Sequence, residues 1–272
     1  MNTPMKKAIY FLASISVMLC GLTSFYAQAQ TPNWSGPYAG LSGGYLSSQS
    51  NWNTQNYSTI GSPIQTADST ASQTFNSSAA QIGAFGGYNW RLNDYVFGIE
   101  GDFGWTNASS SKNFLPGGTA CASYFGCTNL STSGDSTSVQ LGWNASLRPR
   151  FGYLLTPDTL LYGTAGVAIQ SVKISQTCQN SSGDPVCWAL PGNPYSTATN
   201  NYTTLGYTLG AGLEKLIDEW VIRAEYRYTQ YGNINVNSTM SGSGGGNSYA
   251  TTFNSNVKIN TQLINLGVAY KF

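Results

Sequence analysis

The segment 257–272, VKINTQLINLGVAYKF, alternates between apolar residues and small or polar ones. One set of alternate positions is apolar throughout: Ile264, Leu266, Val268, Tyr270 and Phe272. This period of two predicts a β-strand with one apolar face and one mixed face. Such a strand cannot stand alone in a bilayer, because its backbone groups would be unpaired on both sides, so the pattern predicts a closed barrel.

The same alternation recurs along the chain and predicts seven more strands, at 36–47, 78–91, 95–106, 138–153, 159–172, 203–214 and 220–231. Three connections are short, at 91–94, 155–158 and 215–219. Four are long polar runs, at 48–77, 107–137, 173–202 and 232–255. We therefore expect an all-β fold, an eight-stranded antiparallel up-and-down transmembrane β-barrel with short periplasmic turns and four long extracellular loops.

Charged residues indicate which face points inward. Eight of them fall on the face opposite the apolar one: Glu100, Asp102, Arg148, Arg150, Glu214, Arg223, Glu225 and Arg227. A basic side chain that faces lipid at the membrane midplane costs about 2–4 kcal/mol, so this face is expected to line the barrel interior. A soluble barrel of lipocalin type would need the opposite arrangement, with its apolar face inside.

Two interpretations of this interior charge set remain open. Eight strands leave an interior that side chains just fill, which favours an ion-pair plug in which the charges neutralise one another. The alternative is a narrow ion-conducting path lined by the same side chains.

Composition agrees with a membrane barrel. Only 8% of the residues are charged. Outside the N-terminus no run of about 18 apolar residues occurs, which excludes helical membrane spans. Aromatic residues gather near both ends of the apolar face, as in interfacial girdles: Tyr88, Trp90, Tyr95, Tyr153, Trp220, Tyr270 and Phe272 toward the short turns, and Trp105 and Trp143 toward the long runs.

The N-terminus predicts export. Lys6 and Lys7 precede an apolar region at 8–22, and Ala27-Gln28-Ala29 resembles a cleavage site. We expect a signal peptide at 1–29 and a single barrel domain at 30–272. Cleavage would leave ten basic and eleven acidic residues, and this balance offers no basic face for nucleic acid.

Four cysteines remain after cleavage, namely Cys121, Cys127, Cys178 and Cys187. An even number in an exported protein predicts disulfides. Three pairings are possible, and the local ones, Cys121–Cys127 and Cys178–Cys187, are the simplest. The chain contains no histidine, and the cysteine spacings fit no zinc pattern, so no metal site is expected.

Catalytic chemistry is not indicated, and we expect no enzyme activity and no cofactor. Glu100 and Asp102 sit two apart on one strand, so they would not flank a glycosidic bond. Arginine neighbours would also keep both ionised, whereas a general acid needs a raised pKa. Nucleophilic hydrolysis usually requires a histidine base, which is absent.

Several segments together resemble the small porin-family outer-membrane immunogenic proteins of Gram-negative bacteria, which group with OmpA-like and opacity-type eight-stranded barrels. They are WSGPYAGLSGGY (34–45), FGGYNW (85–90), FGIEGDFGW (97–105), LGAGLEKLIDEWVIRAEYRYTQYG (209–232) and LGVAYKF (266–272). The resemblance covers essentially the whole mature chain. It implies a cell outer membrane location, surface exposure, antigenicity, and insertion by the barrel-assembly machinery through a C-terminal signal that includes Tyr270 and Phe272.

The expected function is that of a structural, surface-exposed outer-membrane barrel of the porin family. The alternatives are a weak ion- or solute-conducting porin and an adhesin that binds host or matrix components through its loops. Expected partners are outer-membrane lipid, lipopolysaccharide, the assembly machinery and host-surface ligands of the loops, with no nucleic acid.

Overall fold

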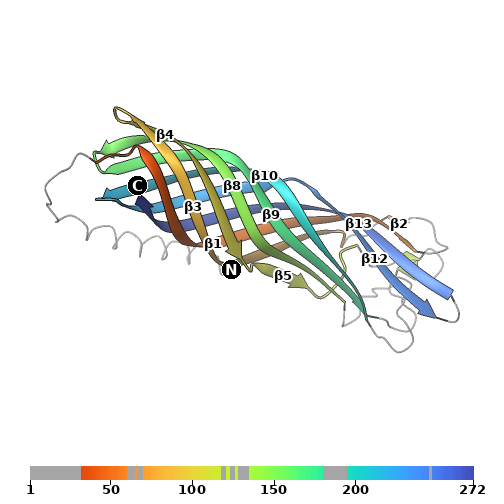
Figure 1. Cartoon of the computed structure of the whole chain (residues 1–272). Coiled ribbons are helices and arrows are strands. Elements are labelled where there is room, and N and C mark those ends of the chain that lie inside the picture. Colours follow the sequence, from red (N-terminus) through yellow and green to blue (C-terminus); the bar gives the residue numbers. More distant parts are fainter. Residues whose placement is uncertain are drawn as a thin grey trace, which may run out of the picture. The chain divides into compact units, whose positions relative to one another are not determined.

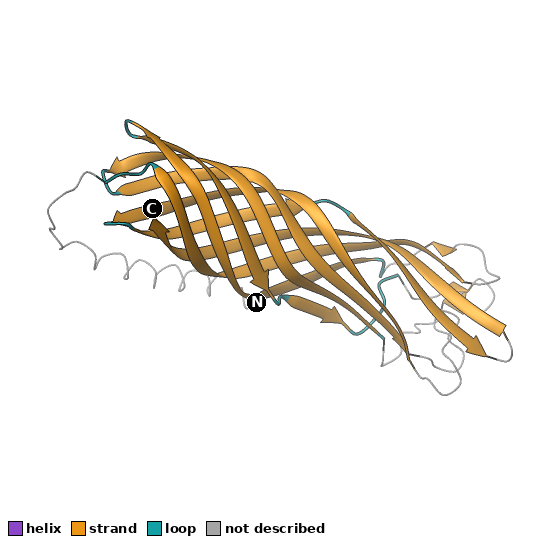
Figure 2. Cartoon of the chain, viewed as in Figure 1, coloured by secondary structure: helices purple, strands orange, loops and turns teal. Residues whose placement is uncertain are grey.

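Long antiparallel strands dominate the computed structural model (Figures 1 and 2). The structure describes residues 32–59, 65–66, 70–117, 121–122, 126–127, 135–179, 195–244 and 247–272. The predicted signal peptide at 1–29 lies outside these residues. The strands are β1 (Gly36–Thr59), β2 (Gln65–Thr66), β3 (Ser72–Leu92), β4 (Tyr95–Thr106), β5 (Ser109–Lys112), β6 (Cys121–Ala122), β7 (Gly126–Cys127), β8 (Ser136–Thr156), β9 (Thr159–Gln179), β10 (Tyr195–Ile217), β11 (Trp220–Tyr231), β12 (Ile234–Gly244) and β13 (Asn247–Lys271).

Eight of these strands close into a ring in the order β1-β3-β4-β8-β9-β10-β11-β13, and β13 pairs back onto β1. Every pairing around the ring is antiparallel. The predicted eight-stranded antiparallel barrel is therefore confirmed. The shorter strands are additions at one end: β2 pairs with β1, β5 with β8, and β12 with β13.

Three tight turns join neighbouring strands at the other end of the ring, which we call the turn end. They follow β3, β8 and β10, and each leaves only two residues between its strands. Asn93 and Asp218 adopt positive φ angles of 55° and 54° at the first turn position. Such angles match the primed turns that suit the right-handed twist of a hairpin, and short polar residues tolerate them. We call the opposite end the loop end.

Strand length is the main correction to the sequence-based expectation. The predicted ranges of β4 and β11 are correct, but the other six ring strands are longer. The polar runs were expected to be loops, yet β1 continues to Thr59, β9 to Gln179, and β10 starts at Tyr195. The four predicted loops are thus shorter than the polar runs in the sequence, because the runs begin or end as paired strand.

The reason for this extension is a reversal of polarity along each long strand. In the turn-end part of β13, Ile264 and Leu266 face outward and are exposed. In its loop-end part the outward positions are polar, while Val257 and Ile259 point inward and are buried. Beyond the lipid, water can contact the outer face, so the apolar residues move to the inside of the barrel.

An exposed apolar band surrounds the turn-end part of the ring. It includes Leu41, Ile82, Phe97, Leu209 and Val268. From Tyr95 to Trp105, the aromatic positions that bound it on β4, the strand rises about 25 Å along the barrel axis, at roughly 3.3 Å per residue and a tilt near 40°. That height matches the apolar belt of an outer-membrane barrel. None of the described residues forms a helix that is long and apolar enough to span a membrane.

Candidate functional site: the charge network inside the barrel

All eight charged residues expected on the inner face lie inside the barrel, and we call them the charge network. They come from four strands: Glu100 and Asp102 from β4, Arg148 and Arg150 from β8, Glu214 from β10, and Arg223, Glu225 and Arg227 from β11. The strand register brings them to one level, since Glu100 lies opposite Arg148 and Glu214 lies opposite Arg223. Their side chains are at most 8% exposed.

Arg148 is at the centre of one half of the network. Its guanidinium lies 2.7 Å from Glu100, 3.0 Å from Asp102 and 2.9 Å from Glu225. Arg227 closes this half by contacting Asp102 at 2.8 Å and Glu225 at 3.0 Å. Asp102 and Glu225 therefore each contact two guanidinium groups.

Arg223 organises the other half. Its Nη2 atom lies 2.5 Å from Glu100 and 2.6 Å from Glu214. Arg150 contacts the same two carboxylates, at 3.4 Å and 2.7 Å. Glu100 is thus shared between the two halves, which makes the network continuous.

The network is electrically balanced, with four arginines and four carboxylates. Removing isolated charges from water costs several kcal/mol per ion, and only close partners with good geometry offset that cost. The balance and the short distances supply those partners. The arrangement leaves no member free to act as an unpaired binding group within the network.

Aromatic side chains complete the network, a role that the alternation along the sequence does not predict for them. The Tyr38 hydroxyl donates to Glu100 at 2.7 Å, and the Tyr162 hydroxyl donates to Glu225 at 2.8 Å. The Arg223 guanidinium lies over the Phe85 ring at 4.0 Å, a cation–π arrangement. The sequence does contain a signal that these aromatic side chains point inward, because each of them occupies the face of its strand that is otherwise small or polar.

A turn-end layer of apolar side chains fills the barrel between the network and the tight turns. Each of its members is at least 94% buried, and together they come from every side of the ring: Trp34, Tyr38, Phe85, Val96, Leu154, Leu160, Tyr162, Leu216, Val221 and Ala269. Trp34 anchors the segment before β1 across this end, because its indole nitrogen donates to the carbonyl of Pro157 at 3.0 Å.

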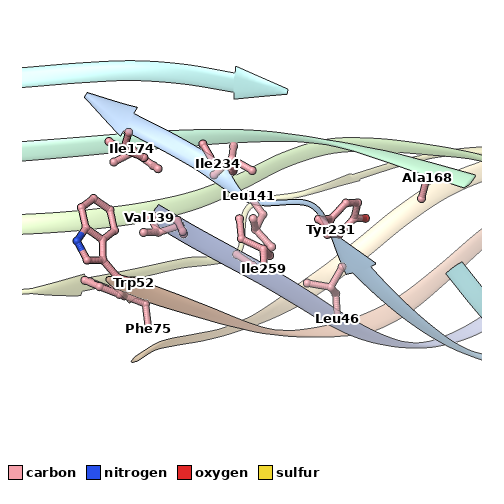
Figure 3. Close-up of a cluster of buried hydrophobic side chains, with 14 of the residues drawn as sticks. Leu46, Trp52, Phe75, Val139, Leu141, Ala168, Ile174, Tyr231, Ile234 and Ile259 are labelled. Atoms are coloured by element: carbon pink, nitrogen blue, oxygen red, sulfur yellow. The ribbon is translucent and has the colours of Figure 1, made fainter. Parts of the chain in front are cut away.

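A loop-end layer of apolar side chains fills the barrel on the other side of the network (Figure 3). It contains Leu46, Trp52, Phe75, Ala108, Val139, Leu141, Ala168, Val172, Ile174, Tyr231, Ile234, Val236, Val257, Ile259 and Leu263. Figure 3 shows Trp52 beside Phe75, with ring centroids 6.0 Å apart, and Val139, Leu141 and Ile259 in the same interior. Buried polar side chains such as Thr137 and Gln176 lie on the same inward faces. The network therefore lies between two layers in which apolar side chains predominate.

The residues after β5 also turn over the loop-end layer. Leu115 is buried, and the Thr54 hydroxyl donates to the carbonyl of Pro116 at 2.7 Å. The backbone N–H of Gly117 donates to the Thr70 hydroxyl at 3.1 Å. These two hydrogen bonds connect the segment after β5 to β1 and to Thr70, just before β3.

A small cavity lies between the network and the loop-end layer. Its volume is about 10 Å³, close to the minimum that one water molecule needs. Polar groups of Gln81, Asn144 and Thr229 line it together with Arg227. This cavity is too small to form a conduit for hydrated ions.

The other predicted site residues lie outside the network. Cys121 and Cys127 are directly paired across β6 and β7, and Cys178 is disulfide-bonded. Cys187 lies outside the described residues. Tyr270 and Phe272 are exposed at the turn end, where their rings meet edge to face at 5.3 Å, and Tyr270 makes a similar contact with Trp220.

The aromatic residues expected in the turn-end girdle are exposed and contact one another both along a strand and across strands. Tyr88 packs against Trp90 at 4.8 Å, and Tyr95 packs against Tyr153 at 5.4 Å. Toward the loop end, Trp105 is exposed and pairs in register with Trp143. Aromatic side chains at these two heights suit the two interfaces of a bilayer.

Comparisons with known proteins agree with this architecture. The model of the family described as outer membrane protein beta-barrel domain matches residues 16–272. The 25 kDa outer-membrane immunogenic protein of Brucella abortus is 33% identical over 241 residues, which cover 88% of this chain and 80% of that protein. The 22 kDa outer membrane protein of Rhizobium leguminosarum is 34% identical over 148 residues, 54% of this chain and 50% of that protein.

Among solved structures, the outer membrane protease OmpT of Escherichia coli is similar in fold, with a TM-score of 0.50. The match covers 92% of this chain and 100% of that chain at 9% identity. At this identity the likeness concerns the barrel fold alone.

Proposed function

This chain belongs to the family of outer membrane protein β-barrel domains, and we propose that it is a closed, non-conducting barrel of the bacterial outer membrane whose function is structural and antigenic. It presents its loop-end segments at the cell surface and has no enzymatic activity. Its relatives named as outer-membrane immunogenic proteins support surface exposure.

The observation that carries this proposal is the succession of three filled layers in the interior. A balanced charge network lies between a turn-end and a loop-end layer of buried apolar side chains. A pore needs a continuous polar path for ions, and hydrophobic constrictions close such paths by excluding water. Neutralised charges between two apolar layers favour a plug over a conducting path.

Single-channel recording in a planar bilayer tests the proposal. The inserted wild-type protein should give no conductance steps. A variant with Arg223→Ala and Arg227→Ala should also stay silent, because both apolar layers remain. Adding Leu141→Ser and Ile259→Ser, which breach the loop-end layer, together with Leu160→Ser and Leu216→Ser, which breach the turn-end layer, should produce steps. Insertion is checked for each protein by the change in gel mobility between unboiled and boiled samples.

Reproducible steps in the wild type would overturn the closed-barrel proposal. If the step size then changed in the variant that lacks Arg223 and Arg227, the weak-porin alternative would apply, with the network lining the path.

Processing and assembly belong to the same proposal. Residues 1–29 act as a cleaved signal peptide, and residues 30–272 form the barrel domain. The barrel-assembly machinery inserts the protein through a signal that includes Tyr270 and Phe272, and the exposed band contacts outer-membrane lipid and lipopolysaccharide. Mass spectrometry of the N-terminal peptide of the protein from outer membranes tests the cleavage, which should leave Gln30, free or cyclised to pyroglutamate, as the first residue.

The disulfides are proposed to be Cys121–Cys127 and Cys178–Cys187. Directly opposed residues on antiparallel strands have Cα atoms about 4.5–5.5 Å apart, within the range that a disulfide bridges. Cys121 and Cys127 occupy such positions, and Cys178 is disulfide-bonded. The braced loop-end segments are where host ligands would bind, if the protein also acts as an adhesin. Peptide mapping without reduction checks both pairings.

A further inference from the structure

A polar hollow lies on the outward face of the barrel, beyond the apolar band on its loop-end side. It has a volume of about 460 Å³ and crosses β3, β1 and β13. Its lining is rich in side-chain amides and hydroxyls and includes one cation: Asn51, Asn53, Ser72, Thr74, Asn256 and Lys258. The strand register makes this lining contiguous, since Asn51 pairs with Lys258 on one side and with Thr74 on the other.

The hydrogen bonds within the hollow leave donors facing outward. Asn51 Oδ1 accepts from the Thr74 hydroxyl at 3.2 Å, and Asn53 Oδ1 accepts from the Ser72 hydroxyl at 3.2 Å. With these carbonyl oxygens engaged, the amide NH₂ groups remain as donors beside the Lys258 ammonium. A ligand that suits this set must supply acceptors, and at least one of them should be anionic.

The surrounding charge agrees with an anionic ligand. Among the described residues, the outward face beyond the apolar band carries Lys173 and Lys258 and no carboxylate. Asp135, the acidic residue described in this part of the chain, is buried. An anion approaching the hollow therefore meets no opposing surface charge from the described strands.

The height of the hollow identifies the source of the anion. On β13, Lys258 lies three outward positions beyond Ile264, the last apolar position of the band. This corresponds to about 20 Å along the strand and about 15 Å above the band for a strand tilted near 40°. Because loop ends of outer-membrane barrels face the outside, the hollow is level with the sugars of the outer leaflet.

We propose that this hollow binds the phosphorylated inner-core saccharide of lipopolysaccharide molecules that border the barrel. Lys258 pairs with a phosphate, and the amides of Asn51 and Asn53 donate to sugar and phosphate oxygens. The inference rests on the proposed contact with lipopolysaccharide and is independent of whether the barrel conducts. The site faces sideways, above the lipid-facing band on the same side of the barrel, so the saccharide of a lipopolysaccharide molecule seated against that band reaches it without leaving the leaflet.

The test uses the full refolded protein in detergent and the phosphorylated inner-core oligosaccharide released from lipopolysaccharide by removal of its acyl chains. Calorimetry should show binding to the wild type. Lys258→Gln should weaken it at least tenfold, and enzymatic removal of the phosphates from the oligosaccharide should have a similar effect. Lys173→Gln, the matched control at the other outward lysine, should change affinity less than twofold.

Three results would overturn the proposal: no binding to the wild type, unchanged binding to Lys258→Gln, or equal weakening by Lys173→Gln, which would indicate a diffuse surface charge effect. Stronger binding of a sulfated host polysaccharide than of the inner-core oligosaccharide would also overturn it. A gel-mobility check on every variant separates loss of the site from loss of the fold. Planar-bilayer silence or conductance bears only on the closed-barrel proposal.

Discussion

At the scale of single residues, Arg148 is the most informative position in the network. It contacts Glu100, Asp102 and Glu225 from the interior of the barrel and is fully buried. Arg148→Met would leave the interior with one excess negative charge. Breaking a buried ion pair from one side costs about 3–5 kcal/mol, and we expect a loss of that size in the free energy of unfolding, measured by urea titration in lipid vesicles.

A compensated variant is the control for this prediction. Arg148→Met combined with Glu225→Gln keeps the interior charge at zero, so it should be less destabilised than Arg148→Met alone. Lys215→Met, which removes a partly exposed pair with Asp158, should cost no more than about 1 kcal/mol. Equal losses for Arg148→Met and Lys215→Met would contradict a network whose stability depends on paired charges.

Asp158, in the turn between β8 and β9, gives a pH-dependent prediction outside the membrane. The Lys215 ammonium donates to it at 2.9 Å and the Thr156 hydroxyl at 2.6 Å, and these bonds lower the pKa of Asp158 from 3.8 to about 2. A lowered folded-state pKa stabilises the protein above pH 4, and this contribution is lost as the pH falls from 4 to 2.

The expected size of this effect is small, because Asp158 is 39% exposed and solvent screens the pair. Asp158→Asn should therefore reduce the fall in unfolding free energy between pH 5 and pH 2 by less than about 1 kcal/mol. Urea titrations of both proteins across that window measure it. A steeper fall in the variant than in the wild type would contradict the direction of the shift.

Some of the residue-scale result was accessible from the sequence and some was not. The eight inward charges follow from strict alternation, because lipid excludes them from the opposite face. Tyr38, Phe85 and Tyr162 follow the same alternation, but an aromatic on the inner face is compatible with simple filling of space. Only the register between strands, which sequence periodicity does not give, brings them against Glu100, Arg223 and Glu225.

At the scale of strands, the three tight turns and the turn-end halves of the ring strands could be predicted, whereas the loop-end extensions could not. An alternating pattern with apolar outward positions ends where the lipid ends. On β9 the outward positions change from Val167 and Ile169 to Ser171 and Lys173. The inward positions Val172 and Ile174 continue the alternation, but they lie on the face of β9 that is mostly small or polar in its turn-end part.

The extension of β9 has a proteolytic consequence. Lys173 lies at the start of a run predicted as loop, yet it is paired with Gln140 of β8 and Asn201 of β10. Lys112, by contrast, lies in β5, a strand of four residues that pairs with β8. Proteases need a locally unfolded segment, and a short strand opens more easily than a long one paired on both sides. Trypsin should therefore cut after Lys173 at least tenfold more slowly than after Lys112.

Mass spectrometry of timed digests of the vesicle-inserted protein measures both cuts. The boiled protein, in which all strands are lost, is the control and should be cut at both lysines at similar rates. Cleavage after Lys173 as fast as after Lys112 in the inserted protein would mean that this part of β9 is open, as the sequence pattern alone suggested.

At the scale of the whole molecule, the decisive feature is that strands from opposite ends of the chain complete the ring. β1 and β13 pair over the length from Tyr38–Lys271 to Thr59–Thr251. This closure removes the free edges that a bilayer does not tolerate, and it holds the network and its two apolar layers in a single enclosed interior. Closure is also the condition under which the outward hollow across β3, β1 and β13 exists.

An engineered disulfide tests this closure directly. Ser47 and Gln262 are opposite one another across β1 and β13, and both side chains face outward. Opposed residues on antiparallel strands have Cα atoms about 4.5–5.5 Å apart, within disulfide range, whereas diagonal neighbours are about 7–8 Å apart. Ser47→Cys with Gln262→Cys should therefore crosslink in the folded barrel, while Ser47→Cys with Asn260→Cys should not.

The crosslink would join most of the chain into one loop, so it should change the mobility of the boiled, unreduced protein, and reduction should reverse the change. Crosslinking of the diagonal pair in preference to the opposed pair would mean that β1 and β13 close with a shifted register, which would also separate the Asn51–Lys258 pair on which the outward hollow depends.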